Sequence, residues 1–98
     1  MNVRYSRRAQ RDLEAIHEYL VRRSPRGALN VLTALYAAIE FVRRYPAAAE
    51  VTNIPSIRAK VVNQYRFKIF YRIVEPDGAV EIVHIRHTSR RAWIGDNA

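Results

Sequence analysis

The apolar residues of this chain change their spacing once, near its middle, and that change limits the folds it can adopt. Between residues 7 and 44 they recur every three or four positions, which is typical of helices that bury one side. Between residues 57 and 87 they alternate instead, which is typical of strands with one covered face. The sequence therefore predicts two helices followed by a set of strands.

Capping and turn residues set the boundaries of these elements. Ser6 is suited to cap a first helix over residues 7–23, and Ser24-Pro25 suits the start of a second over residues 25–44. Tyr45-Pro46 ends the second helix, and Glu75-Pro76-Asp77-Gly78 is a turn between two strands. The remaining predictions are a strand at residues 2–5, a loop at 47–56, and strands at 57–62, 65–74 and 79–87.

The order of elements predicts an α+β fold of type β-α-α-β-β-β. Consecutive strands joined by short turns form an antiparallel sheet, and a helical hairpin must cover one of its faces. A chain of 98 residues has room for a single domain, which we place at residues 1–98.

The composition limits the kinds of partner and of metal or disulfide site that we expect. The chain has 17 basic and 9 acidic residues, a net charge of +8, which favours an anionic partner. It has no cysteine, which excludes disulfides and thiolate metal sites. His84 and His87 are three apart in a strand and should point to opposite faces, so we expect neither a metal nor a cofactor. The longest apolar run is too short for a bilayer, so we expect a soluble, cytoplasmic protein without membrane contact.

The strand at 65–74 predicts one apolar and one cationic face. Alternate residues from Tyr65 to Ile73 suit a core beneath the helices. The other face has Arg66, Lys68, Phe70 and Arg72, which we expect to be open to a partner. With Arg58 and Lys60 in the preceding strand, residues 58–74 have five basic and no acidic side chains. Such a face with an exposed Phe suits nucleic acid or an acidic peptide, although an ordinary solvated face has the same pattern.

The tail from His84 to Trp93 also suits an anion. It contains Arg86, His87, Arg90 and Arg91 and no carboxylate. Trp93 could stack on a base or anchor the tail to the core.

The predicted helices have arginines in their first turns and carboxylates suited to ion pairs. Arg7, Arg8 and Arg26 occupy first helical turns, where the helix dipole disfavours cations, and such local costs often mark functional surfaces. The carboxylates of the first helix, Asp12 among them, are expected to form ordinary ion pairs on its surface.

Three segments in this order resemble the RelE/ParE toxin superfamily of type II toxin–antitoxin systems. They are the start from Tyr5 to Leu13, the strand segment Phe70-Tyr71-Arg72-Ile73, and the tail from His87 to Trp93. Ser24-Pro25-Arg26 before a long apolar helix ending in Arg44-Tyr45-Pro46 is similar too. The resemblance covers essentially the whole chain, and the long helical hairpin is closer to ParE-like members.

The resemblance implies a toxin neutralised by an acidic cognate antitoxin in a hetero-oligomer. A ParE-like member would inhibit DNA gyrase by binding. The alternative is a RelE-like ribonuclease that cleaves mRNA on the ribosome without a metal, and its catalytic residues here would be Lys60, Lys68, His87, Arg90 and Arg91. For a binding toxin, the contact residues to target or antitoxin would be Arg58, Arg66, Phe70, Arg72, Arg86, Trp93, Arg7 and Arg8. Trp93 stands where several ribonuclease members have a proton-transfer group, which favours binding. A basic module that holds nucleic acid by charge alone is a third hypothesis.

Overall fold

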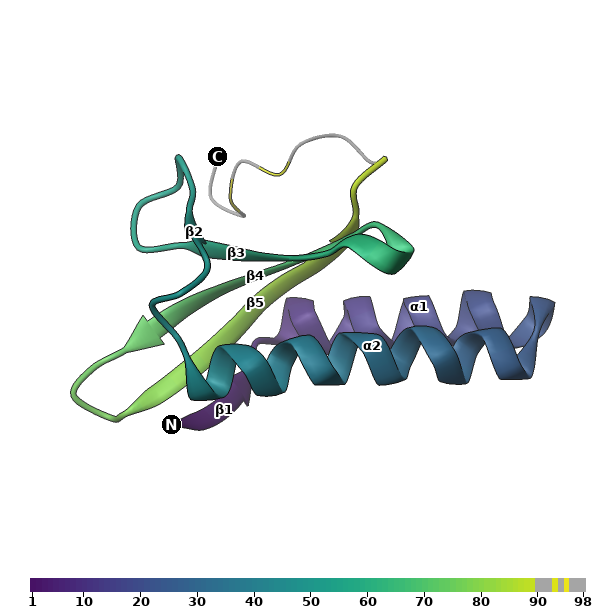
Figure 1. Ribbon diagram of the computed structural model, residues 1–98, viewed down its shortest axis with the longest axis horizontal. Coiled ribbons are helices and arrows are strands. Elements are labelled where there is room, and N and C mark those ends of the chain that lie inside the picture. The colour runs from purple at the N-terminus through teal and green to yellow at the C-terminus, as the bar shows by residue number, and fades with distance from the viewer. Residues whose placement is uncertain (90–92, 94, 96–98) are drawn as a thin grey trace.

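The computed structural model describes residues 1–89, 93 and 95 of the chain. Two long helices lie side by side against a twisted sheet (Figure 1). The elements in chain order are β1 (Asn2–Tyr5), α1 (Arg7–Arg23), α2 (Pro25–Arg44), β2 (Glu50–Val51), β3 (Arg58–Val62), the 3₁₀ turn η1 (Asn63–Tyr65), β4 (Phe67–Val74) and β5 (Ala79–His87).

Both helices begin and end where the sequence predicts. The Ser6 hydroxyl accepts a hydrogen bond from the Ala9 N–H at 3.0 Å, and Ser24 accepts one from the Gly27 N–H at 3.0 Å. These caps satisfy backbone donors that the first turn of a helix leaves without partners. No helix in the described part of the chain is long and apolar enough to cross a membrane.

The sheet has five strands in the order β1-β5-β4-β3-β2. β1 pairs with β5 in parallel, and the other neighbours are antiparallel. The predicted β-α-α-β-β-β order is confirmed, with two corrections. Tyr65 belongs to η1 rather than to the long strand, because Arg66 has a φ of 60° and interrupts the extended chain. The predicted loop also contains β2, whose residue Glu50 lies opposite Ala59.

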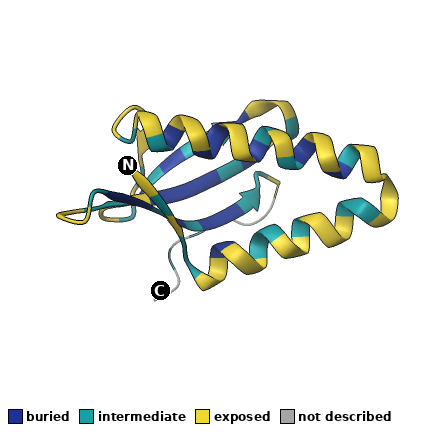
Figure 2. Cartoon of the chain, turned by 90° about the horizontal axis from the view of Figure 1, so that it is seen from below, coloured by how far each residue is buried: buried dark blue, intermediate teal, exposed yellow. Residues whose placement is uncertain are grey.

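The helices cover one face of the sheet, and the main core lies between these two layers. Figure 2 colours the buried residues, which lie on the sheet and along the sides of the helices that face it. Leu35 and Val42 of α2 are fully buried there, together with Ile69, Tyr71 and Ile82 of the sheet. The alternation in β4 therefore predicted its apolar side correctly.

The opposite face of the sheet, which we call the outer face, has an apolar cluster of its own. Phe70, Ile57 and Ala59 are its buried members, and Trp93 and Val83 pack against them. Only 5% of Phe70 is exposed, so the expectation of an exposed Phe70 is wrong. The alternating pattern distinguishes two faces of a strand, but it does not reveal that Trp93 packs against one of them.

Candidate functional site

Three pairs of directly opposed residues in β4 and β5 form the centre of the outer face. Lys68 lies opposite Arg86, Phe70 opposite His84, and Arg72 opposite Glu81. A β-bulge makes this arrangement, because Tyr71 pairs with Ile82 while Phe70 pairs with His84, which leaves Val83 as the extra residue. Without the bulge, the alternation in β5 would turn His84 to the same side as Ile82.

Like charges meet at one end of this surface. Lys68 and Arg86 are direct cross-strand neighbours, and Lys68 has no carboxylate partner within the described residues. Like charges directly opposite each other destabilise a sheet. The Arg86 guanidinium lies over the Phe70 ring, 5.7 Å from its centroid, which holds this charge close to the aromatic cluster. Lys68 is therefore the cation of this surface best placed to meet an anion.

The other end of the outer face is neutralised. The Arg72 Nε atom lies 2.6 Å from Glu81 Oε1, and these residues are opposed in the strand register. Residues 58–74 contain no acidic side chain of their own, so the carboxylate that neutralises Arg72 comes from the neighbouring strand. Glu81 lies nine positions further along the chain, beyond the turn, so the two side chains meet only once β4 and β5 have paired.

Three rings form the centre of the surface. The Phe70 and His84 rings are stacked, with centroids 5.8 Å apart and planes 16° from parallel. Trp93 contacts both, at 4.8 Å from Phe70 and 4.9 Å from His84. Of the two roles considered for Trp93, these contacts favour anchoring the tail, although the anchor is the outer-face cluster rather than the main core.

Asp12 binds the edge of β5 just beyond the end of β1. Its Oδ2 atom accepts a hydrogen bond from the Ile85 N–H at 2.9 Å and lies 2.7 Å from His84 Nδ1. Burial alone would raise the pKa of Asp12, but the hydrogen bonds from His84 and Ile85 and the charges of His84 and Arg8 together lower it. The expectation of an ordinary surface pair is therefore wrong for Asp12, because Arg8 at 3.4 Å is only one of its partners.

The remaining predicted site residues lie in several places. Arg58 donates to the Ala47 and Ala49 carbonyl oxygens at 3.2 and 2.9 Å and so holds the segment that leads into β2. The Lys60 ammonium lies 4.5 Å from the Phe41 ring centroid, which places it on the helix side of the sheet. Arg66 is exposed at the end of η1.

Three further predicted site residues lie in the described part of the chain, namely His87, Arg7 and Arg8. The His87 ring meets the Phe67 ring edge-on at 5.3 Å, also on the helix side, and its Nδ1 atom lies 2.7 Å from Ser89 Oγ. Arg7 and Arg8 are exposed in the first turn of α1. Arg90 and Arg91 lie outside the described residues.

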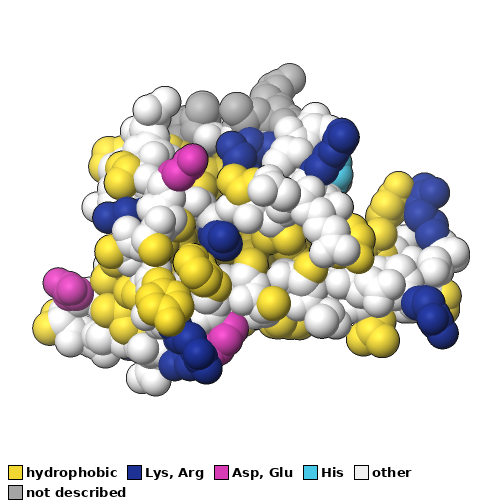
Figure 3. Space-filling view, in the orientation of Figure 1, with side chains coloured by type: hydrophobic (Ala, Val, Ile, Leu, Met, Phe, Trp, Pro, Cys, Tyr) yellow, Lys and Arg dark blue, Asp and Glu magenta, His cyan; other side chains and the backbone are white. Residues whose placement is uncertain are grey.

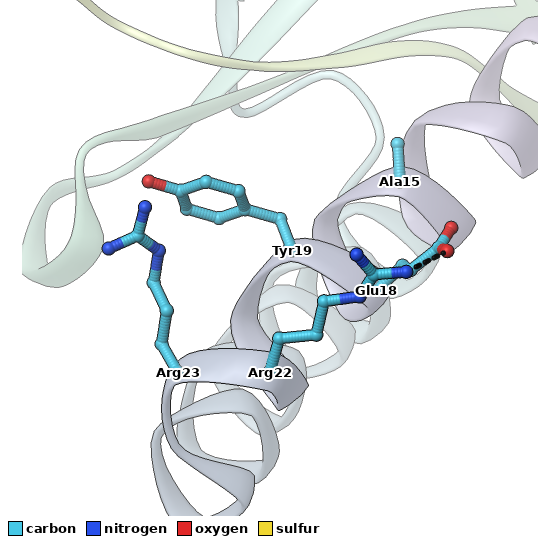
Figure 4. Close-up of a pocket in the computed structure, with 5 residues that line it drawn as sticks. All are labelled: Ala15, Glu18, Tyr19, Arg22 and Arg23. Carbon is cyan, nitrogen blue, oxygen red and sulfur yellow. Dashed lines mark hydrogen bonds and ion pairs between the residues drawn. The ribbon is translucent and has the colours of Figure 1, made fainter.

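A shallow pocket of about 430 Å³ lies on the solvent side of α1, lined by Ala15, Glu18, Tyr19, Arg22 and Arg23 (Figure 4). Its charges are already engaged, since Arg22 lies 3.2 Å from Glu18 and Arg23 lies 4.4 Å from the Tyr19 ring centroid. The cationic end of the outer face therefore remains the better candidate for a binding surface.

Comparison with known proteins agrees with this architecture. The family model for the ParE toxin of the parDE type II toxin–antitoxin system matches residues 3–92. The chain belongs to the ParE toxin family. That match includes α1, α2, all of the sheet except Asn2, and most of the residues that form the outer face.

Individual relatives of this ParE family member share less than a third of its residues. The candidate toxin Y4kP of Sinorhizobium fredii (strain NBRC 101917 / NGR234) is 29% identical over 89 residues, which are 91% of this chain and 90% of that protein. The structure of a chromosomal ParDE system from P. aeruginosa matches with a TM-score of 0.77 at 21% identity, over 91% of this chain and 97% of that one. Isolated RelE from E. coli matches with a TM-score of 0.59 at 13% identity, over 92% and 86%. At these identities the two structures show a shared fold.

Proposed function

We propose that this ParE family member is the toxin of a type II toxin–antitoxin pair and inhibits DNA gyrase by binding it. Family membership over residues 3–92 supports the toxin assignment. Lys68 supports an anionic contact on the target, because it lies on the outer face beside Arg86 and has no carboxylate partner among the described residues.

One observation favours binding over RNA cleavage. Lys68 lies on the outer face, whereas Lys60 and His87 lie on the helix side. Metal-free cleavage requires a base, an acid and a phosphate-binding cation around a single phosphodiester. Side chains on opposite faces of a sheet cannot surround one phosphate, so these three residues do not form a ribonuclease site together.

We also propose that an acidic antitoxin neutralises the toxin. The net charge of +8 would accelerate association with an acidic chain. The exposed apolar side chains of the helices would supply contact area for an amphipathic segment, since Tyr19 and Tyr45 are both more than half exposed.

A supercoiling assay tests the target. The purified chain should block ATP-dependent supercoiling of relaxed plasmid by gyrase at micromolar concentration. Lys68→Glu should weaken this inhibition by at least about tenfold, because it reverses a charge at the contact. Glu14→Gln is the matched control, because Glu14 is exposed on α1, away from the outer face.

Two results would change the assignment. Unaffected gyrase together with cleavage of ribosome-bound mRNA would replace the proposal with the RelE-like ribonuclease. The antitoxin proposal has a separate test, in which the adjacent reading frame is coexpressed. It would be contradicted if that frame encoded no acidic protein able to restore growth.

A further inference from the structure

The solvent side of α2 has an apolar stripe that no other element of the described chain covers. Leu29 is 66% exposed and Tyr36 is 50% exposed, and Thr33 and Ala37 are exposed as well. Their spacing of three and four places all four on one side of the helix. Figure 3 shows hydrophobic side chains on the surface formed by the helices. Single exposed apolar residues are ordinary, but a continuous stripe is typical of an interaction surface.

Opposite charges lie at equal distances on either side of Thr33. Arg26 precedes it by seven positions and Glu40 follows it by seven, and seven residues are close to two helical turns. Both side chains therefore lie on the same side of α2 as Thr33. Arg26 has no acidic partner among the described residues and occupies the first turn, where the dipole disfavours it. Glu40 pairs with Arg43 and Arg44, and its two oxygens can accept further hydrogen bonds.

We infer that this stripe binds the same stripe of a second copy of the chain. The two α2 helices would run antiparallel, with the two-fold axis at Thr33. Residues at equal and opposite distances from Thr33 then share a height, so Arg26 meets Glu40 of the second copy at both ends of the contact. Leu29 packs beside Tyr36 of the second copy, and small Thr33 and Ala37 allow the helix axes to approach to about 10 Å.

The charge pattern favours a second copy over an acidic segment of another protein. The two-fold axis at Thr33 would place an arginine beside a carboxylate at both ends of the contact, whereas an acidic segment would meet Arg26 only, since Glu40 is already paired with Arg43 and Arg44. A second antiparallel copy gives Arg26 the carboxylate that it lacks. The contact is small, because a helix of 20 residues is about 30 Å long. A contact along one helix of this length is smaller than the interfaces of obligate dimers, so the dimer should dissociate on dilution.

Single-cysteine crosslinking tests the geometry, because the chain has no cysteine of its own. In Thr33→Cys the two thiols would face each other on the two-fold axis, within the roughly 4.4–6.8 Å Cα separation that a disulfide spans. Glu14→Cys, on the exposed side of α1, is the control for random collision. Under mild oxidation, Thr33→Cys should form covalent dimer at least about ten times faster.

Charge reversal then tests the pairing. Added to Thr33→Cys, Arg26→Glu should slow crosslinking because the new carboxylate would face Glu40 of the second copy, and the further change Glu40→Arg should restore it. Circular dichroism establishes that each variant is folded, and sedimentation of the unmodified chain should show a monomer–dimer equilibrium. Equal rates for Thr33→Cys and Glu14→Cys, or no rescue by the double reversal, would overturn the inference.

Discussion

Replacing Asp12 with asparagine should lower the free energy of unfolding by about 2 kcal/mol. The Asp12 carboxylate accepts from the Ile85 N–H at 2.9 Å and lies 2.7 Å from His84 Nδ1, and only 16% of its side chain is exposed. Hydrogen bonds to a charged group contribute about 1.5–3 kcal/mol and neutral ones about 0.5–1.5 kcal/mol. Asparagine retains the shape but not the charge, so each of two bonds loses about 1 kcal/mol. In a domain of this size the melting temperature should fall by roughly 8–16 °C.

The same substitution should remove a pH dependence. The pKa of Asp12 is lowered in the folded chain from its ordinary value of 3.8. A lowered folded pKa contributes stability that is present above the unfolded pKa and is lost as the pH falls through the folded pKa. The difference between wild type and Asp12→Asn should therefore shrink as the pH falls below about 4.

Urea unfolding followed by circular dichroism measures both effects across a pH series. Glu14→Gln is the matched control, because it removes a carboxylate from the exposed side of the same helix. It should change stability by less than about 0.5 kcal/mol. If Asp12→Asn were as stable as Glu14→Gln at pH 7, the Asp12 contacts would not stabilise the fold as we argue.

Three further substitutions test the outer face. Phe70→Ala should lower the free energy of unfolding by about 3–5 kcal/mol. It should also shift the fluorescence emission of Trp93, the single tryptophan, to longer wavelength, and an unshifted spectrum would contradict the ring contact. Arg72→Ala should cost less than about 1 kcal/mol in urea unfolding, because the pair with Glu81 is partly exposed, and a larger loss would show that the pair is better shielded. Lys68→Ala should leave the free energy of unfolding unchanged or raise it slightly, since it removes a like-charge neighbour, and it should weaken the proposed inhibition of gyrase. A loss of stability would contradict this interpretation.

Local rules predicted the helices and most of the sheet. Ser6 and Ser24 are caps in the sequence and in the structure, because a cap depends on backbone donors only three residues away. The last strand was predicted at residues 79–87 and spans Ala79–His87, because its start follows a strong turn signal. The family resemblance is also confirmed by the match over residues 3–92.

The candidate site was harder to predict because its contacts join distant parts of the chain. Asp12 and His84 are 72 positions apart, and no local pattern distinguishes Asp12 from Glu14 or Glu18 on the same helix. The bulge at Val83 determines which face of the sheet His84 lies on. The alternation of apolar residues in the sequence does not show where such a one-residue shift of register occurs. Burial of Phe70 depends on Trp93, which returns to the sheet from beyond the last strand.

These distant contacts connect three segments in series. Asp12 of α1 binds the His84 ring, and that ring packs against Trp93 of the tail. The position of Trp93 consequently depends on the orientation of His84, and the orientation of His84 depends in turn on a residue of α1. A partner that displaced Asp12 from His84 would loosen the aromatic cluster beside Lys68 and Arg86 without touching either cation. Binding along α1 and binding on the outer face are therefore expected to influence each other through His84.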